Sequence, residues 1–228
     1  NDAYKSIYES LTHAGAHHDT RVTVHKVDAE KIAEEGPATL LKDMDGILIP
    51  GGFGDRGTEG KIIATQFARQ NSIPFFGICL GMQIATIEFS RNVCGLEKAN
   101  STEFDPETAH PVISLQEEQK GLTTMGGNMR LGASEAKVFP GTKAYELYGS
   151  ETITERHRHR YEFNNDYLEA FEKGGMMATG KNPRTGLIEI IELPKDVHPY
   201  YVGVQFHPEY KSTVENPHPL FVSFIKAA

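Results

Sequence analysis

One cysteine, Cys79, stands between two glycines where the sequence changes character. The preceding residues, 73–78, are apolar and rich in Ile and Phe, as in a buried parallel strand, and a helical pattern begins directly afterwards. The run Gly77-Ile78-Cys79-Leu80-Gly81 therefore has the layout of a nucleophile elbow with Cys in place of Ser, at a helix N-terminus that favours a thiolate. The alternative is a buried structural cysteine, which we prefer for Cys94 because it lacks this glycine frame.

A cysteine nucleophile needs a base, and the sequence offers ten histidines. In "VGVQFHPEY", residues 202–210, His207 ends an apolar run and Glu209 follows two positions later. Positions i and i+2 of an extended chain face the same side, so Glu209 can hold one ring nitrogen while the other accepts the thiol proton. Strand ends in a parallel sheet share one edge, which would bring His207 to Cys79. For an isolated His-Pro-Glu tripeptide, a purely structural turn is the commoner explanation.

The glycine-rich run "GFGDRG", residues 52–57, matches the G-x-G-x-x-G pattern of dinucleotide-binding loops. That pattern also needs an acidic residue ~20 positions later, at the tip of the next strand, and here this tip is Ile78-Cys79. The lysine of "TEGKI" does not complete a phosphate-binding P-loop, because Ile follows it. We therefore expect the glycine turn to expose backbone N–H groups for an oxyanion.

The segment "RHRHR", residues 156–160, puts three arginines on one face of an extended strand and two histidines on the other. Three explanations stay open: a solvated charged face, a patch for phosphate or nucleic acid, and a His-x-His metal pair. No nearby Cys or carboxylate pattern supports the metal pair. An arginine fork suits a single carboxylate, because its two N–H groups match two oxygens.

Composition excludes several function classes. Lys and Arg total 23 against 31 Asp and Glu, a formal net charge of −8, which argues against a nucleic-acid or anionic-membrane partner and leaves a small neutral or zwitterionic substrate open. The two cysteines form no CxxC and no disulfide framework, so we expect a reducing, cytoplasmic setting. No apolar run approaches the ~20 residues of a membrane span, and the first ten residues lack a signal-peptide layout.

Alternating helices and strands must bring these residues together. Apolar spacing predicts helices around residues 4–11, 29–42, 59–70, after 79, 165–175 and 218–228. Apolar or β-branched runs predict strands within residues 21–27, 44–52, 73–78, 110–115, 128–138, 152–163, 176–181, 187–193 and 200–206. We expect an α/β fold, a central, mostly parallel sheet flanked by helices with a smaller antiparallel extension, in one domain over residues 1–228.

Several segments together resemble a known family. "GICLGMQ" and "FHPE" are similar to the hallmarks of the class I glutamine amidotransferases. "PGGFGDRGTEGK", "NSTEFDPET", "MGGNMRLG", "ERHRHRYEFNN" and "QFHPEYKST" narrow the resemblance to the glutaminase domains of CTP synthases, over nearly the whole chain.

The resemblance implies glutamine hydrolysis to glutamate and ammonia. Cys79 would attack the side-chain amide, His207 would move the proton and Glu209 would orient His207, leaving a γ-glutamyl thioester that water hydrolyses. The implied oxyanion donors are the backbone N–H groups of Gly52 and Leu80. The implied substrate-binding residues are Phe53, Gln83, Glu103 for the α-ammonium and Arg160 for the α-carboxylate.

The resemblance also implies partners and cofactors outside these residues. In the family, a synthase domain of the same polypeptide uses ATP and magnesium to convert UTP to CTP with this ammonia, in pyrimidine nucleotide biosynthesis, and GTP is an allosteric activator. We expect no cofactor and no metal in this domain, a homotetrameric full-length enzyme and a monomeric fragment. Family members usually begin with a strand before the first helix, and we expect that strand and the synthase domain outside residues 1–228. Arg130 of "GGNMRLG" would contact an effector or the partner domain.

Two rival interpretations stay open. The first is another cysteine amidohydrolase of the same fold, such as a γ-glutamyl hydrolase or the glutaminase component of a different amidotransferase; Arg160 and Glu103 as a pair favour free glutamine over a peptide. The second is a catalytically silent regulatory or assembly domain, which an intact Cys79, His207 and Glu209 disfavour.

Overall fold

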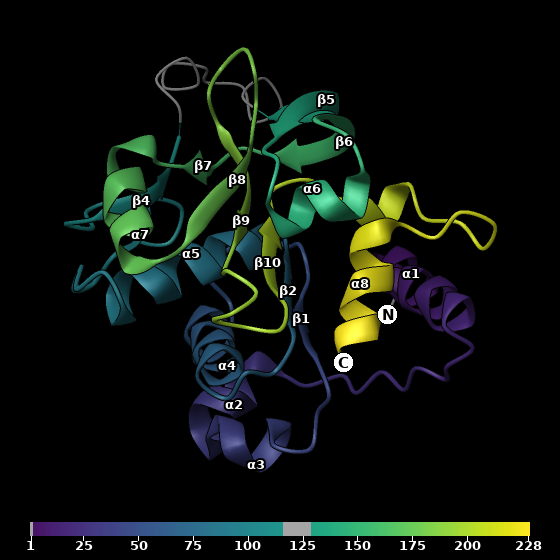
Figure 1. The fold of residues 1–228 in the computed structure, drawn as a ribbon. Coiled ribbons are helices and arrows are strands. Elements are labelled where there is room, and N and C mark those ends of the chain that lie inside the picture. The colour runs from purple at the N-terminus through teal and green to yellow at the C-terminus, as the bar shows by residue number, and fades with distance from the viewer. Residues whose placement is uncertain (1, 116–128) are drawn as a thin grey trace.

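In the computed structural model, which describes residues 2–115 and 129–228, a seven-stranded sheet passes through the middle of the molecule (Figure 1). Its strands, in spatial order, are β1 (Ile47–Ile49), β2 (Phe75–Ile78), β10 (Tyr201–Val204), β9 (Ile188–Glu192), β8 (Met177–Lys181), β5 (Arg130–Val138) and β6 (Thr152–His159). A three-stranded sheet contains β3 (Asn100–Ser101), β4 (Pro111–Ser114) and β7 (Glu162–Phe163). The predicted α/β class is confirmed, and both halves of the chain share the large sheet. This sheet is mixed instead of mostly parallel, because two of its strand pairings are parallel and four are antiparallel.

The parallel part of the large sheet places the candidate nucleophile beside the candidate base. β2 pairs in parallel with both β1 and β10, whereas β10, β9, β8, β5 and β6 pair antiparallel in that order. Val204, the last residue of β10, is in register with Ile78, the last residue of β2. The residues that follow these two strands therefore emerge at one edge of the sheet.

The sheet curls, so that its far edge strand also reaches this site. β6 is the last strand in the spatial order, yet the carbonyl of Arg156 on β6 accepts a hydrogen bond of 2.8 Å from the backbone N–H of His207. Accumulated strand twist has this effect in sheets of several strands.

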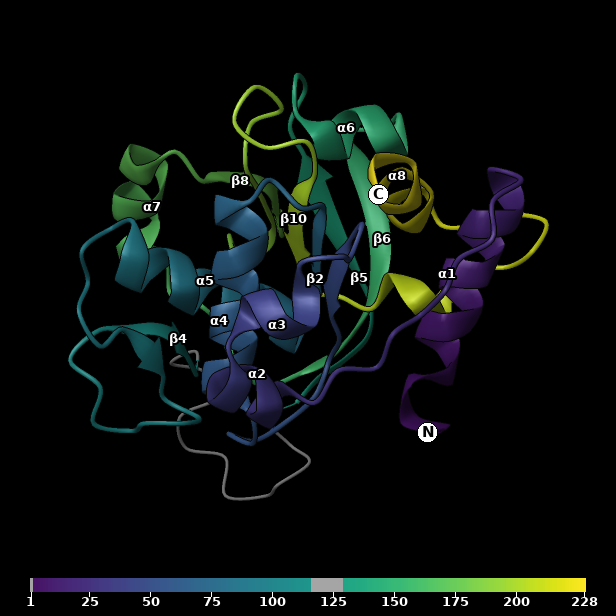
Figure 2. The ribbon, with the colours of Figure 1, turned by 90° about the horizontal axis from the view of Figure 1, so that it is seen from below.

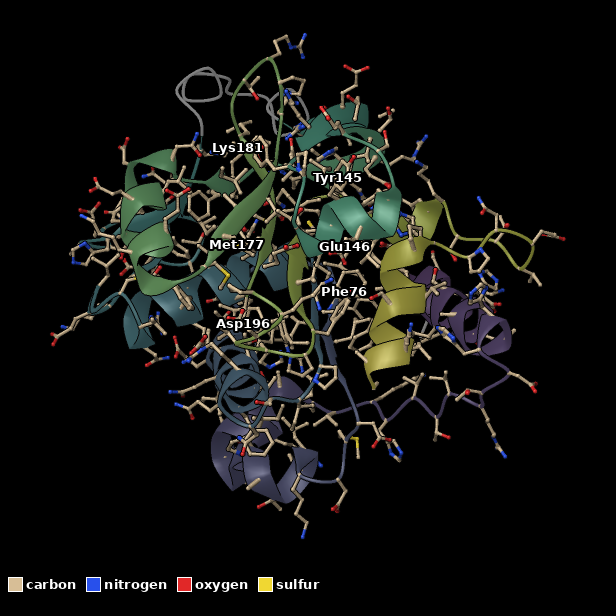
Figure 3. All side chains as sticks on the ribbon, viewed as in Figure 1. Phe76, Tyr145, Glu146, Met177, Lys181 and Asp196 are labelled. Atoms are coloured by element: carbon tan, nitrogen blue, oxygen red, sulfur yellow. The ribbon has the colours of Figure 1, made fainter. Side chains whose placement is uncertain are left out.

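Helices cover both faces of the sheet. They are α1 (Lys5–His17), α2 (Ala29–Glu35), α3 (Pro37–Leu41), α4 (Thr58–Gln70), α5 (Leu80–Asn92), α6 (Lys143–Tyr148), α7 (Leu168–Gly174) and α8 (Pro219–Ala227). α1, α6 and α8 pack on one face, while α4, α5 and α7 pack on the other with α2 and α3 outside α4 (Figure 2). Phe76 of β2 packs against Phe221 and Phe224 of α8, with ring centroids 5.2 and 5.8 Å apart, on the first of these faces (Figure 3). The core is therefore two apolar layers separated by the sheet.

Two predicted elements differ in the structure. Residues 21–27 form no strand: the segment is extended but pairs with no strand in the described part of the chain, and it lines, together with β1, a cavity of about 780 Å³. The helix predicted over 29–42 is two helices, α2 and α3, because Gly36 has a φ of 84° and Pro37 follows it. A residue before proline is driven out of the helical region, and glycine accepts the positive φ.

The other predicted strands and helices are present with shifted ends. The predicted strand over 152–163 is divided into β6 and β7, and the predicted helix over 165–175 begins with a short 3₁₀ helix, Asn165–Tyr167, before α7. Residues 126–128 of "GGNMRLG" lie outside the described residues.

Candidate active site

Cys79 forms the corner between β2 and α5 and is almost completely buried. Its φ of 52° and ψ of −103° are unusual for a residue other than glycine, as at a nucleophile elbow. A Cβ atom at Gly77 would lie 2.6 Å from the backbone of Gly81, and one at Gly81 would overlap the carbonyl oxygen of Ile49. The two glycines therefore allow the turn to close against β1.

His207 follows the end of β10 and lies beside Cys79. Its Nδ1 is 2.7 Å from Oε1 of Glu209, and both residues are buried. A methyl group at Gly51 would come within 2.8 Å of Cε1 of His207 and 3.5 Å of Cβ of Cys79, so these two side chains flank one small space. The structure thus brings together the three residues that the sequence selects as nucleophile, base and orienting carboxylate.

The charge state of His207 depends on its two neighbours. Burial alone lowers the pKa of His207, but hydrogen bonding and charge attraction from Cys79 and Glu209 raise this pKa to about 10. An imidazole that binds a proton this strongly takes one readily from a nearby thiol.

The candidate oxyanion donors lie close to each other. Leu80 is the first residue of α5, so its backbone N–H belongs to the first turn, where no helical carbonyl can accept it. A Cβ atom at Gly52, in the turn after β1, would lie 3.3 Å from Cδ2 of Leu80. The turn that contains Gly52 thus packs against Leu80, the residue directly after the elbow.

The candidate partners of the substrate's charged groups meet around Tyr161. Glu103 accepts a hydrogen bond of 3.1 Å from the backbone N–H of Gly54 in the glycine-rich turn. Burial raises the pKa of Tyr161, the charge of Glu103 raises it further, and the charge of Arg160 lowers it, so both charges lie near its ring. An anionic and a cationic side chain near the same ring suit a zwitterion.

Phe53 and Gln83 occupy different environments. The Phe53 side chain is 56% exposed, and the guanidinium of Arg158 lies 5.9 Å from the centroid of its ring. Gln83 is buried, and its Nε2 donates to the carbonyl of Tyr161 at 3.1 Å. The Gln83 amide therefore hydrogen-bonds within the protein interior, whereas the Phe53 ring is accessible to solvent.

Residues 156–159 alternate on β6 as predicted, but Arg160 follows the end of β6 and is half-buried instead of sharing the exposed face of the other two arginines. Arg156 and Arg158 are exposed, while His157 and His159 are buried with Nδ1 of His157 2.9 Å from Nε2 of His159. Burial, together with the charge of Arg130, lowers the pKa of His157 to about 2 and that of His159 to about 3. The two histidines are therefore neutral hydrogen-bonding groups inside the protein.

Arg130 points inward. Its guanidinium contacts Oε1 of Glu189 at 2.5 Å and Oε1 of Glu162 at 3.4 Å, and it also donates to the hydroxyl of Ser134 at 2.8 Å. Burial raises the pKa of Glu162 to about 8 despite the opposing charge of Arg130. The sequence predicts an effector or partner-domain contact for Arg130, whereas these contacts place it in a buried polar cluster.

One buried polar residue near Cys79 escapes the sequence analysis. Nε2 of Gln205 lies 3.8 Å from Sγ of Cys79. The available signal is its position two residues before His207, which puts both side chains on one face of an extended chain. Cys94, in contrast, is half-buried with Sγ 3.5 Å from the carbonyl of Ala170, and burial raises its pKa, as expected of a structural cysteine.

Neither a helix suited to cross a membrane nor a cluster of metal-ligating side chains is found in residues 2–115 and 129–228. Within these ranges, no helix is long and apolar enough to cross a membrane. In the same residues, no group of three or more His, Cys, Asp or Glu side chains is arranged to hold a metal ion.

Comparisons with known proteins agree with this geometry. The family model described as "Glutamine amidotransferase class-I" matches residues 1–227. The CTP synthases of Caldanaerobacter subterraneus and Cytophaga hutchinsonii are 59% and 58% identical over 227 residues, all of this chain but 42% of the length of each relative. The glutaminase domain of Trypanosoma brucei CTPS, solved with bound acivicin, matches with a TM-score of 0.92 and 39% identity over 100% of this chain and 88% of that one.

A more distant structure shares the fold alone. It is a putative GMP synthase component from Thermoplasma acidophilum, with a TM-score of 0.58 and 17% identity over 98% of this chain and 86% of that one. The family model and the high-identity structural match decide the assignment. The chain therefore belongs to the class I glutamine amidotransferase family, within which it matches the glutaminase domain of CTP synthase.

Proposed function

We propose that this chain hydrolyses L-glutamine to glutamate and ammonia through Cys79, His207 and Glu209. The observation that supports this most directly is the 2.7 Å contact between His207 and Glu209 beside a cysteine with a positive φ of 52°. A nucleophile, a base and a group that orients the base are the minimum set for acyl transfer through a covalent intermediate.

In the proposed reaction, Sγ of Cys79 bonds to the side-chain carbonyl carbon of glutamine while the thiol proton passes to His207. Because Glu209 holds Nδ1 of His207, Nε2 is the nitrogen that takes this proton. The carbon–nitrogen bond then breaks, and His207 gives the proton to the departing ammonia. Water attacks the γ-glutamyl thioester with His207 again as the base, which releases glutamate and restores the thiol.

The negative charge of each tetrahedral intermediate rests on the former carbonyl oxygen. We assign its stabilisation to the backbone N–H groups of Gly52 and Leu80, because these two residues pack against each other beside the elbow. Loss of one such donor typically costs ~100-fold or more in rate.

We assign the α-carboxylate of glutamine to Arg160 and its α-ammonium to Glu103. The location of both charges near Tyr161 supports this pair. Phe53 and Gln83 complete the pocket, Phe53 as an exposed wall and Gln83 from its buried position at the base. A site that pairs both α-groups selects free glutamine over a glutaminyl peptide.

We further propose that residues 1–228 act as one domain of a longer enzyme, because the relatives of known function are more than twice as long. In that enzyme a synthase domain of the same polypeptide would use ATP and magnesium to convert UTP to CTP with the ammonia formed here. GTP would activate the glutaminase step, the full-length enzyme would be a homotetramer, and the reaction would take place in the cytoplasm.

The test is covalent labelling by the glutamine analogue diazo-oxo-norleucine, with intact mass and peptide mapping as readouts. We expect one label, located at Cys79 and prevented by excess L-glutamine. Acivicin, the ligand bound in the Trypanosoma brucei structure, is a second probe. Cys79→Ser should remove both labelling and glutaminase turnover, whereas Cys94→Ser should retain both. Labelling elsewhere, or labelling that glutamine does not reduce, would favour the silent-domain alternative.

A further inference from the structure

Gln205 is a completely buried amide that links the candidate nucleophile to a chain of hydrogen bonds. It lies between β10 and His207, and its backbone N–H donates to the carbonyl of Glu189 at 2.9 Å. Its side chain contacts two groups: Oε1 lies 3.3 Å from Nε2 of Gln83, and Nε2 lies 3.8 Å from Sγ of Cys79. Gln205 is therefore fixed at both ends of its side chain.

The direction of these hydrogen bonds follows from one backbone carbonyl. The carbonyl of Tyr161 can only accept, so the atom of Gln83 that faces it at 3.1 Å is the amide nitrogen. The same nitrogen faces the side chain of Gln205, which must therefore present its oxygen to Gln83. The remaining amide nitrogen of Gln205 is left to donate to the sulfur of Cys79.

The carbonyl of Tyr161 is itself held in place by the two buried histidines. Nδ1 of His159 lies 3.2 Å from this carbonyl and must donate to it, so Nε2 of His159 accepts from Nδ1 of His157 at 2.9 Å. Both histidines are almost completely buried on β6. The orientation of the Gln205 amide is thus set by a continuous chain of buried hydrogen bonds that runs from His157 through His159, the carbonyl of Tyr161 and Gln83.

Besides His207, the carbonyl of Arg158 and the amide of Gln205 contact Sγ of Cys79, and these two groups favour opposite charge states of the sulfur. The carbonyl of Arg158 lies 4.0 Å from Sγ and suits the thiol, which can donate a hydrogen. The amide nitrogen of Gln205 suits the thiolate, because a donor interacts more strongly with a charged acceptor. Replacement of the donor would therefore shift the balance toward the less reactive thiol.

We propose that Gln205 is a positioning residue that holds the sulfur of Cys79 as a thiolate, with its donor aimed at Sγ through Gln83 and the carbonyl of Tyr161. This inference rests on the proposed role of Cys79 as nucleophile and adds a residue to that site. Gln83 then acts on the sulfur through Gln205 in addition to lining the glutamine pocket.

The test uses Gln205→Met, which keeps the approximate length and removes the donor, and Gln205→Glu, which retains an acceptor for Gln83 but places a carboxylate oxygen at the sulfur. The readout is the ultraviolet absorbance of the thiolate as a function of pH, taken as the difference between each protein and its Cys79→Ser counterpart. His207, Glu209, Tyr210 and Arg158, the other titratable or charged groups near Cys79, stay unchanged in both variants.

We expect the thiolate signal at neutral pH to fall and its titration to move to higher pH in both variants, more in Gln205→Glu. The kcat of glutamine hydrolysis should fall about tenfold in Gln205→Met with little change in KM, the size expected for one hydrogen bond to a charged group. Gln83→Met should lower kcat in the same direction, and the double variant should lose less than the two single losses combined. Urea unfolding of each variant separates these effects from loss of folding.

The outcomes distinguish this inference from the proposed function. A thiolate titration of folded Gln205→Met and Gln205→Glu that superimposes on that of the unaltered protein overturns the role of Gln205, whatever the glutaminase assay shows. Failure of diazo-oxo-norleucine to label Cys79 in the unaltered protein overturns the proposed function, while the thiolate titration still reports on the contact between Gln205 and Cys79.

Discussion

The backbone N–H of Cys79 donates a hydrogen bond of 2.7 Å to the carbonyl of Val204. Val204 ends the strand that leads into His207, so the turn that bears the nucleophile is attached directly to the strand that bears the base. The separation of the two side chains is therefore fixed by strand pairing, and small changes around this junction should alter catalysis more than folding.

Gly51→Ala should reduce kcat by about 100-fold, the typical cost of moving a catalytic group by ~1 Å. The added methyl group would lie 2.8 Å from Cε1 of His207 and would push the ring away from Cys79. Gly36→Ala is the matched control: its φ of 84° strains an alanine, but nothing lies within 4 Å of the new methyl group. It should lower the free energy of unfolding by about 1–3 kcal/mol and leave kcat unchanged. Equal kcat values in the two variants would contradict the prediction.

Arg160→Ala should raise the KM for glutamine by at least about 30-fold, because truncation of one partner of a buried, hydrogen-bonded charge pair costs about 2 kcal/mol or more. Small neutral alkylating reagents should still modify Cys79. Arg156→Ala, four residues earlier on β6 and with an exposed side chain, should leave KM unchanged. Steady-state kinetics with glutamine decide the point, and an unaltered KM in Arg160→Ala would remove Arg160 from the pocket.

Glu209→Gln should lower kcat by about 100-fold or more, because an amide neither fixes the tautomer of His207 nor stabilises its protonated ring. It should also change the alkaline stability. The pKa of His207 is raised from 6.5 to about 10, so the folded protein binds more protons than the unfolded chain in that window, and stability is lost as pH rises through it.

Because Glu209→Gln lowers the pKa of His207, this loss should occur at lower pH in the variant. Urea unfolding between pH 6.5 and 10 measures it, with Glu215→Gln, an exposed carboxylate, as the control. If the unfolding free energies of Glu209→Gln and the unaltered protein decreased identically between pH 6.5 and 10, Glu209 would not interact with the charged imidazole.

His157→Gln should make the protein less sensitive to acid. Burial and the charge of Arg130 lower the pKa of His157 from 6.5 to about 2. Below pH 6.5 the unfolded chain therefore binds a proton that the folded protein excludes, and the free energy of unfolding decreases as the pH is lowered. In a plot of unfolding free energy against pH, the slope of the variant below pH 6.5 should be smaller by up to about 1.4 kcal/mol per pH unit. His25→Gln removes an exposed histidine and should leave this slope as it is. Equal slopes in both variants would count against the buried, neutral state of His157.

Arg69→Met should destabilise the fold without a direct effect on chemistry. Arg69 of α4 contacts both carboxylate oxygens of the fully buried Glu88 of α5, at 2.7 and 2.9 Å. Removal of one partner leaves the other charge buried, which costs about 3–5 kcal/mol. Lys173→Met breaks an exposed pair with Glu169 and should cost less than about 1 kcal/mol. Comparable losses of unfolding free energy in the two variants would contradict this difference.

The sequence predicts correctly those features that depend on residues close together in the chain. The elbow around Cys79 is recognisable because close backbone approach demands glycine at positions 77 and 81, and the apolar run before it has the composition of a buried strand. The alternation in residues 156–159 likewise follows from the two-residue period of a strand. His207 and Glu209 are in contact as predicted, but for a different reason: residues Pro208–Tyr210 form a 3₁₀ helix instead of continuing the strand.

Contacts between segments that lie far apart in the chain could not be predicted from the sequence. The curl that brings β6 against His207 depends on the accumulated twist of seven strands, and no local pattern encodes it. Residues 21–27 have the composition of a strand, but a strand exists only where a neighbour supplies hydrogen bonds. Arg130 looks like a surface contact in sequence because its partners, Glu162 and Glu189, lie more than thirty residues away.

The contact between β6 and the ends of β2 and β10 has a consequence for folding. The catalytic geometry combines segments near residues 79, 156–158 and 204–209, so it closes only after long loops have been ordered, which is slow in folding. Recovery of glutamine-protected labelling during refolding should therefore coincide with the last kinetic phase. A nascent chain in which residues 201–209 have not yet been synthesised would lack β10, His207 and Glu209 and could not form this site.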